Sequence, residues 1–219
     1  MLETILEISF LSDWHVSSGL GDGAIADSIL NRDINGIPVI PGSAIKGALR
    51  EGAWRLALCD RDKLGWLVDY VFGTACHADV SNHSGIITVG QGQLPDSLCD
   101  WLVANPDQRA DIVTDMTIIR QHTALDSHKM VVPHSLRSIE CGIPGLVFMA
   151  PLNLLLPEGA EQWFTDWLGA VCACVKSLGA DRARGMGRCK ISPHCAPDIK
   201  LPGEQPEAVK TIRESREKK

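Results

Sequence analysis

The feature that most constrains the fold is the order in which strand-like and helix-like patterns follow one another. Apolar and polar residues alternate loosely over 3–12, and an apolar stripe of helical period follows over 43–58. Short apolar runs at 86–91 and 146–156 flank a long polar segment, and a second amphipathic helix is predicted over 161–178. With a last strand after that helix, this order predicts an α+β fold with a ferredoxin-like (RNA-recognition-type) core, two helices on an antiparallel sheet.

The 219 residues suit one domain with long insertions. We predict a single domain over 1–201, with insertions near 74–85 and 112–140, and a polar, mobile tail over 202–219. Residues 112–137 predict two strand-like arms around an exposed tip. Insertions this long in a compact domain are usually functional.

Composition narrows the class of protein. The chain has no run of eighteen apolar residues and no basic, cleavable start, so we expect a cytoplasmic protein without a membrane partner. A net charge of −6 argues against a free-standing nucleic-acid binder. It leaves a local basic face open, because the basic residues cluster over 46–63, 120–137 and 176–190.

The segment "GADRARGMGR", residues 179–188, could bind phosphate. Its glycines let backbone N–H groups approach an anion, and Arg182, Arg184 and Arg188 add charged, bidentate donors. The alternative is a tight connection between a helix and a strand, with solvated arginines. No Walker motif is present, because no GK[ST] closes the loop.

The segment "PGSAIKGALR" begins the first predicted helix. Ser43 is predicted to cap it, and Lys46 and Arg50 follow within the first two turns. A helix N-terminus with a nearby lysine attracts anions. By itself the segment fits an ordinary capped helix equally well.

Two carboxylates, Asp27 and Asp33, precede this helix in a glycine-rich loop. Such a pair could bind Mg²⁺ or act as acid and base. Turn formation is the alternative, especially for Asp33 in "RDING".

The polar 112–137 segment holds histidines and basic residues that could touch nucleic acid. Met130 with Val131 and Val132 near its tip could wedge between bases. A solvent-facing hairpin is the alternative.

The eight cysteines are expected to be reduced thiols. Cys76, His77 and His83 could hold zinc, with Cys59 as a further ligand. No CxxC pair is present, so the ligand spacing is irregular for a structural zinc site.

Together, several segments resemble the RAMP superfamily of CRISPR-associated proteins. They are "WHVSSG", "DSILNRDINGIPVIPGSAIKGALR", "VFG", "TALDSHKM" with "RSIE", and "GADRARGMGR". Their order and spacing are most similar to the Cas-seven-type backbone subunit of type III effector complexes. The resemblance covers nearly all of residues 1–191.

This resemblance implies a ferredoxin-like core with a protruding thumb hairpin. It implies a subunit that assembles along CRISPR guide RNA with copies of itself or paralogous RAMP subunits, and with other effector-complex subunits. The thumb would kink the duplex of guide and complementary target RNA and flip a base at six-nucleotide intervals. The subunit would then act as a metal-dependent endoribonuclease that uses Mg²⁺ or another divalent cation. The 2′-hydroxyl of the target RNA itself would attack the adjacent phosphate and cut the target.

Carried over by residue, the resemblance makes Asp27 catalytic and Asp33 structural. The thumb matches residues His122, Thr123, Lys129, Met130 and Arg137. RNA contacts match residues His15, Ser43, Lys46, Arg50, Arg182, Arg184, Gly185, Met186, Gly187 and Arg188.

Three other functions remain open. A non-cleaving scaffold subunit would keep the guide contacts but hold Asp27 away from the phosphate. A guide-processing endoribonuclease of the same superfamily would use a histidine near the first helix, and His15 is the candidate. A zinc-dependent enzyme would use Cys76, His77 and His83.

Overall fold

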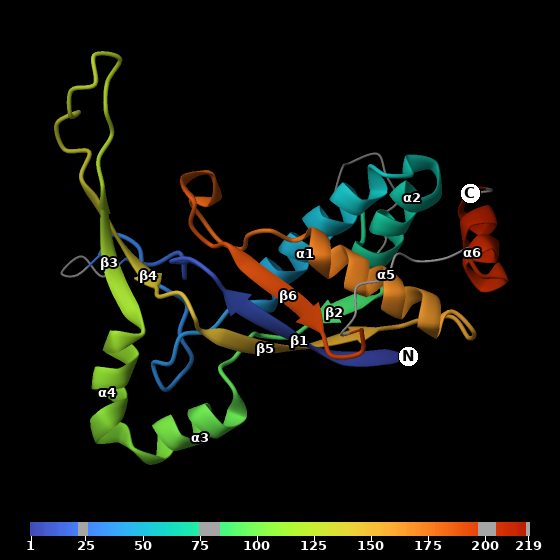
Figure 1. Cartoon of the computed structure of the whole chain (residues 1–219), viewed down its shortest axis with the longest axis horizontal. Helices are drawn as coiled ribbons and strands as arrows, with labels where there is room; N and C mark the ends of the chain where they lie inside the picture. The colour runs from blue at the N-terminus through green and yellow to red at the C-terminus, as the bar shows by residue number, and fades with distance from the viewer. Residues whose placement is uncertain (22–25, 75–83, 197–204, 218–219) are drawn as a thin grey trace.

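Four antiparallel strands form the main sheet of the computed structural model, which describes residues 1–21, 26–74, 84–196 and 205–217. The strands are β1 (Leu2–Phe10), β2 (Ile87–Val89), β5 (Val147–Leu154) and β6 (Cys189–Pro193). Their order across the sheet is β2-β5-β1-β6, and every neighbouring pair is antiparallel. With the helices between them, this is the ferredoxin-like arrangement that the sequence predicts (Figure 1).

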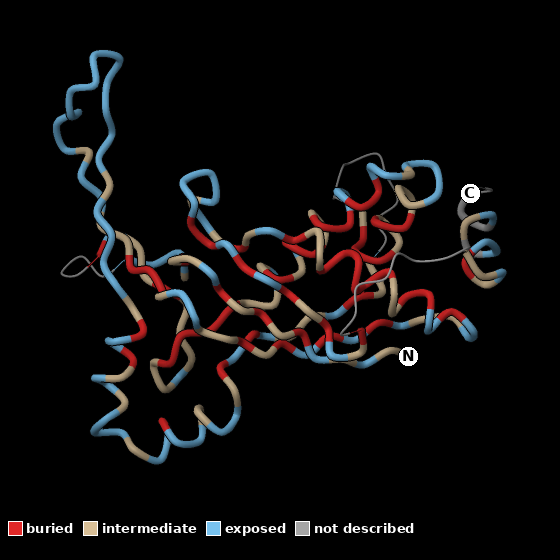
Figure 2. The backbone as a smooth tube through the Cα atoms, in the orientation of Figure 1, coloured by how far each residue is buried: buried red, intermediate tan, exposed pale blue. Residues whose placement is uncertain are grey.

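Helices of this core pack beside the sheet. They are α1 (Gly42–Ala57), α2 (Arg61–Phe72) and α5 (Glu161–Cys174). Burial follows the predicted periods: Leu6, Ile8 and Phe10 alternate as buried residues along β1. In α1, Ile45 and Leu49 belong to a fully buried stripe. The buried backbone therefore concentrates where the helices meet the sheet (Figure 2).

The first turn of α1 rests on the end of β2, and this explains the Pro-Gly-Ser start. A Cβ at Gly42 would lie 2.2 Å from the Val89 carbonyl oxygen, so only glycine fits there. Pro41 occupies the N-cap position, and no side chain caps the helix. The predicted cap at Ser43 is therefore wrong, because the helix begins one residue earlier.

A long insertion separates β2 from β5. It contains α3 (Asp96–Ala104), α4 (Pro106–Asp115), β3 (Thr117–His122) and β4 (Arg137–Gly142). The last two pair as a separate antiparallel sheet and extend into a thumb that projects from the body (Figure 1). The predicted strand start at 112 is wrong, because Pro106 and Asp107 favour the first turn of a helix that continues to Asp115.

The C-terminal segment, which its polarity predicts to be a mobile tail, contains a helix. Residues Glu207–Glu217 form α6. Val209 is fully buried, and the Gln205 side chain donates to the Lys63 carbonyl oxygen at 2.9 Å. One apolar residue and one backbone contact thus anchor a segment whose average composition is polar. Among the described helices, none combines the length and apolar character needed to cross a membrane.

Candidate nucleic-acid interface

Asp27 lies at the surface beside the root of the thumb. Its carboxylate Oδ2 accepts a hydrogen bond from the Ser138 N–H at 2.7 Å, and its own N–H donates to the Ser138 carbonyl at 2.8 Å. Ser28, the next residue, forms a parallel bridge with Ile139. The Asp27 loop therefore runs alongside β4, and the exposed carboxylate sits where the thumb joins the body.

Asp33 forms a turn. Its Oδ1 accepts from the N–H groups of Asn35 and Ile37, both at 2.8 Å. This is the Asx-type turn chemistry that the "RDING" segment predicts. Asp33 thus shapes the approach to α1.

His15 is buried between the Asp27 loop and β4, with 3% of its surface exposed. Its Nδ1 lies 2.6 Å from the Glu140 carbonyl oxygen, and its Nε2 lies 3.1 Å from the Ser28 hydroxyl. A carbonyl oxygen can only accept, so Nδ1 carries a proton, and in the neutral ring Nε2 accepts from the Ser28 hydroxyl. Both ring nitrogens are therefore engaged inside the protein, and the predicted direct contact of this ring with RNA is blocked in this conformation.

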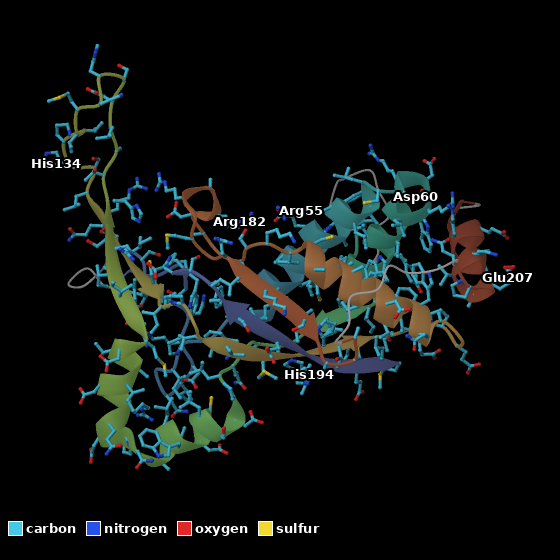
Figure 3. All side chains as sticks on the ribbon, viewed as in Figure 1. Arg55, Asp60, His134, Arg182, His194 and Glu207 are labelled. Atoms are coloured by element: carbon cyan, nitrogen blue, oxygen red, sulfur yellow. The ribbon has the colours of Figure 1, made fainter. Side chains whose placement is uncertain are left out.

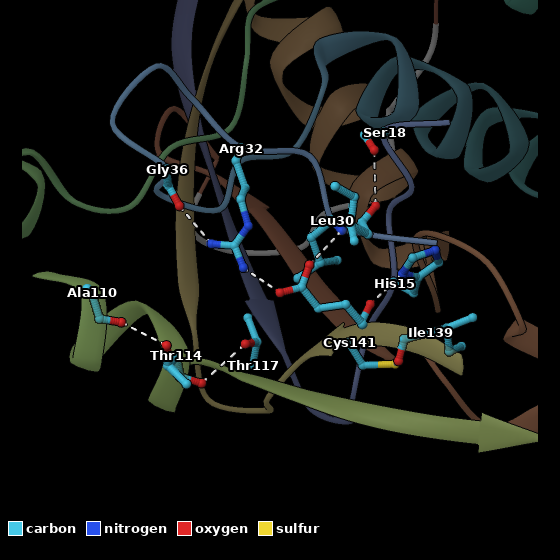
Figure 4. A network of polar contacts seen from close by, with 12 residues as sticks. His15, Ser18, Leu30, Arg32, Gly36, Ala110, Thr114, Thr117, Ile139 and Cys141 are labelled. Atoms are coloured by element: carbon cyan, nitrogen blue, oxygen red, sulfur yellow. Dashed lines mark hydrogen bonds and ion pairs between the residues drawn. The ribbon is translucent and has the colours of Figure 1, made fainter. Parts of the chain in front are cut away.

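Glu140 is a buried carboxylate with partners on both oxygens. Oε2 accepts from the Leu30 N–H at 3.0 Å, and Oε1 pairs with the Arg32 guanidinium. Arg32 also donates to the Gly36 carbonyl at 2.7 Å. Figure 4 shows this network between the loop before α1 and thumb strand β4. It satisfies a carboxylate that would otherwise be costly to bury.

The glycine–arginine loop over 179–188 makes a tight turn before β6. Asp181 and Gly185 adopt left-handed backbone angles around a short 3₁₀ helix, Arg182–Arg184. Gly187 also has a positive φ of 68°, and a Cβ there would lie 2.1 Å from the Leu178 carbonyl oxygen. The Gly187 N–H donates to the Asp13 carbonyl at 2.7 Å, so the loop is fixed against the chain that follows β1.

The arginines of this loop are exposed, and acidic side chains hold two of them. Arg182 pairs with Glu51 on α1, and Arg184 with Asp181 at 3.2 Å. The hydrogen bond from Arg182 is the main cause that lowers the pKa of Glu51, although partial burial opposes it. Arg55 on the same helix also lowers this pKa. Figure 3 shows Arg182 on the loop that leads into β6, on the same side of the molecule as Arg55.

The rest of the loop alternates in exposure. Arg188 is exposed, whereas Met186 is buried and so helps to seat the loop. The Arg188 N–H donates to the Ser12 hydroxyl at 3.0 Å. Exposed cations thus stand on a backbone that is tied down at several points.

Lys46 and Arg50 lie on a different side of α1 from Glu51. Lys46 Nζ donates to the Ile87 carbonyl in β2 at 3.1 Å, and Arg50 pairs with Asp69 in α2 at 3.3 Å. Ser43 is exposed in the first turn. The structure therefore does not bring the two cations of the "IKGALR" segment together with Arg182, and their predicted contacts with guide phosphates stay predictions.

The thumb carries its predicted residues at two levels. His122 and Arg137 face each other as the last pair of the β3–β4 ladder. Thr123, Lys129 and Met130 lie in the exposed tip (Figure 2).

An Asx-type turn orders the end of the thumb. The Asp126 carboxylate accepts from the N–H groups of His128 and Met130 at 2.8 and 2.9 Å. Met130 remains 66% exposed beside the exposed Val131 and Val132. The tip therefore presents apolar side chains on an ordered turn.

The predicted zinc ligands Cys76, His77 and His83 lie outside the described residues. Among those that the structure describes, no group of three or more His, Cys, Asp or Glu side chains could surround a metal.

Burial raises the pKa of the Cys141 thiol, near His15 in the fold, to about 12, so this thiol stays protonated. A single carboxylate such as Asp27 suits Mg²⁺ where RNA phosphates supply further oxygens.

Comparison with known protein families accounts for this set of features. The model of the RAMP superfamily matches residues 7–190. The chain belongs to the RAMP superfamily. The matched range includes the Asp27 loop, the thumb and the glycine–arginine loop. No curated protein is significantly similar in sequence.

Solved structures share the fold of this RAMP chain at low sequence identity. A chain of the type III-B Cmr-beta complex in the apo state is 13% identical, with a TM-score of 0.67 over 90% of this chain and 99% of that one. A chain of Cmr-beta bound to cognate target RNA is 12% identical, with a TM-score of 0.64 over 88% and 97%. A chain of a type IV-B CRISPR complex is 15% identical, with a TM-score of 0.59 over 97% and 98%.

Sequence reasoning missed the polar network of this RAMP chain. Glu140 and Ser28 were not candidate site residues, although both lie in segments that carry the resemblance, "RSIE" and "DSIL". One signal was present: Glu140 comes directly before Cys141 and Gly142, residue types that are often fully buried, and the structure buries all three. A charged residue in such a run has to find a partner.

Proposed function

We propose that the chain is an RNA-binding subunit of a cytoplasmic CRISPR effector complex related to type III. It would bind guide RNA and cut complementary target RNA at six-nucleotide intervals. The observation that carries this proposal is the exposed carboxylate of Asp27, fixed at the root of a protruding hairpin in a RAMP-superfamily chain. One similar fold comes from a complex bound to cognate target RNA, which supports guide and target RNA as partners.

The chemistry would begin with the thumb. Its apolar tip residues Met130 and Val131 would wedge between bases and displace one nucleotide. The 2′-hydroxyl of that nucleotide could then line up with its adjacent phosphate, which is an orientation effect. Asp27 would take the proton from this hydroxyl as the hydroxyl oxygen bonds to phosphorus, and the bond from phosphorus to the 5′-oxygen would break as that oxygen takes a proton from water. The products would be a 2′,3′-cyclic phosphate and a 5′-hydroxyl.

Alternatively, Asp27 would help to hold a divalent cation, which would neutralise the negative charge that builds up during the reaction. The chain's own contribution is to hold the Asp27 carboxylate beside the displaced nucleotide. The glycine–arginine loop would bind the guide backbone through Arg182, Arg184 and Arg188. Base pairing would select the target, and the protein would recognise backbone and shape.

The test uses the complex reconstituted with guide RNA, other effector subunits and Mg²⁺. Wild type should cut labelled complementary RNA at six-nucleotide spacing. Asp27→Ala should bind the target equally well and give no cuts. Asp62→Ala, which changes an exposed carboxylate in the first turn of α2, serves as a matched control and should keep the cuts. If Asp27→Ala cuts like wild type, Asp27 is not the catalytic carboxylate.

A non-cleaving scaffold is the second candidate, and one contact favours it. The Asp27 carboxylate already accepts a hydrogen bond from the Ser138 N–H, which is a structural use of that side chain. Tight target binding without cuts in either protein would identify this function. The guide-processing alternative is weakened, because both nitrogens of its candidate His15 are engaged within the protein.

A further inference from the structure

We infer that His15, Ser28 and Glu140 form a buried clasp that sets where Asp27 stands relative to the thumb. In this role His15 is a positioning residue, and it does not contact RNA. The inference rests on the proposed function for its catalytic consequence. The contacts that carry it are hydrogen bonds between the Asp27 loop, the segment after β1 and thumb strand β4.

The protons in the clasp have fixed places. His15 Nδ1 must donate to the Glu140 carbonyl, and in the neutral ring Nε2 then accepts the hydroxyl proton of Ser28. Ser28 has only that one proton. The Ser17 hydroxyl, 2.9 Å away, therefore donates to the Ser28 oxygen. With a neutral ring, the direction of every bond follows from the one carbonyl, so the Ser28 side chain has a single favourable orientation.

The backbone next to Ser28 is tied to the same strand. The Glu140 N–H donates to the Ser28 carbonyl at 2.9 Å, and the Leu30 N–H donates to the Glu140 carboxylate at 3.0 Å. With the two bonds between Asp27 and Ser138, these contacts hold residues 27–30 along β4. A shift of β4 would therefore carry Asp27 with it.

The clasp also reaches the glycine–arginine loop. The Ala180 N–H donates to the His15 carbonyl at 2.8 Å. Gly179 lies so close that a Cβ there would be 2.4 Å from the same carbonyl oxygen. His15 thus touches all three pieces of the interface: the Asp27 loop, the thumb strand and the arginine loop. A thumb displaced by a bound duplex would pass its movement to Asp27 through this residue.

The experiment measures single-turnover target cleavage beside target affinity in the assembled complex. His15→Asn keeps a donor near the position of Nδ1 but loses the contact with Ser28, and Ser28→Ala loses the same contact from the other side. Each variant should cut about 10- to 100-fold more slowly, because a misplacement of about 1 Å costs this much, while target affinity changes less than about twofold. Thr165→Ala, which removes a hydroxyl that donates within α5 to the Glu161 carbonyl, should cut at the wild-type rate.

Two further variants separate positioning from general loss of structure. The double variant His15→Asn/Ser28→Ala should be no slower than either single variant, because both remove one shared contact. His15→Gln, whose amide oxygen can reach the Ser28 hydroxyl, should recover part of the rate. The clasp would be overturned if the fold-loss of cleavage rate in the double variant equalled the product of the two single losses. It would also be overturned if the single variants cut at the wild-type rate.

Nitrogen-15 spectra of the histidine ring in the free protein give a readout independent of cleavage. They should show the proton on Nδ1, and a proton on Nε2 would overturn the assignment. If wild-type complex cuts nothing, the proposed function fails, and amide hydrogen exchange decides on the clasp. Faster exchange at the Ser138 N–H in Ser28→Ala would support it, and unchanged exchange would overturn it.

Discussion

The Asp27 loop and the glycine–arginine loop are held in different ways. Buried hydrogen bonds from His15 and Glu140 fix the Asp27 loop to β4. The arginine loop has a rigid backbone, but its cation Arg182 is held by an exposed ion pair with Glu51. Buried polar bonds are costly to break, whereas an exposed ion pair contributes at most about 1 kcal/mol. The first arrangement suits a group that must stand in one place, and the second suits cations that exchange a carboxylate for a phosphate.

The largest effect is expected at Glu140. Glu140→Ala should lower the free energy of unfolding by about 2–3 kcal/mol, because Leu30 N–H and Arg32 lose their buried partner. Chemical denaturation monitored by tryptophan fluorescence measures this loss. Glu3→Ala, at an exposed position of β1, is the control and should change stability by less than about 0.5 kcal/mol. Equal stability of the two variants would show that the network does not hold the loop.

A smaller effect is expected in the backbone of the arginine loop. Gly187→Ala should destabilise the protein by about 1–3 kcal/mol, because the new Cβ meets the Leu178 carbonyl at a positive φ. Gly185→Ala has a positive φ of 84° but open space around it, so it should cost only about 1 kcal/mol. Thermal unfolding of the two variants checks this order. The reverse order would contradict the packing described for the loop.

Arg182 should affect RNA binding and leave folding intact. Arg182→Ala should weaken guide RNA binding and reduce the slope of log affinity against log salt by about one, because one phosphate contact is lost. Filter binding at several salt concentrations measures both. The unfolding midpoint should stay unchanged. A variant that unfolds earlier but binds guide normally would assign the arginine a structural role.

The smallest effect is expected at Glu51. Glu51→Gln should tighten guide binding about two- to threefold at pH 7. The reason is that Arg182 no longer has to break its ion pair with the Glu51 carboxylate before it binds a phosphate. The pKa of Glu51 is lowered in the folded protein, so its pairing is complete above the ordinary value of 4.5 and is lost as pH falls below it. The difference between variant and wild type should therefore narrow under acid conditions. Titrations of guide RNA at pH 7 and at a pH below 4.5 measure this difference. Weaker binding by the variant at pH 7 would contradict the idea that Arg182 exchanges a carboxylate for a phosphate.

The sequence predicts the core well, because apolar residues recur with the period of the strand or helix that buries them. The alternation along β1 and the apolar stripe of α1 both hold in the structure. The turn at Asp33 is likewise local chemistry. What sequence cannot supply is the rotation of one element against another, and only the fold shows that the Lys46 ammonium bonds to the Ile87 carbonyl.

The interface shows the same limit. His15 looks like an available imidazole in the sequence, and only the fold places the Glu140 carbonyl and the Ser28 hydroxyl against its two nitrogens. Similarly, the buried position of Val209 depends on a contact that polar composition does not indicate.

The most direct test measures guide binding and target cleavage for Asp27→Ala and Arg182→Ala side by side in the assembled complex. The account predicts that Asp27→Ala binds guide and target normally but does not cut. Arg182→Ala should bind guide more weakly, yet cut at the wild-type rate once guide is saturating. Loss of binding in Asp27→Ala, or loss of cutting at saturation in Arg182→Ala, would contradict this division of roles.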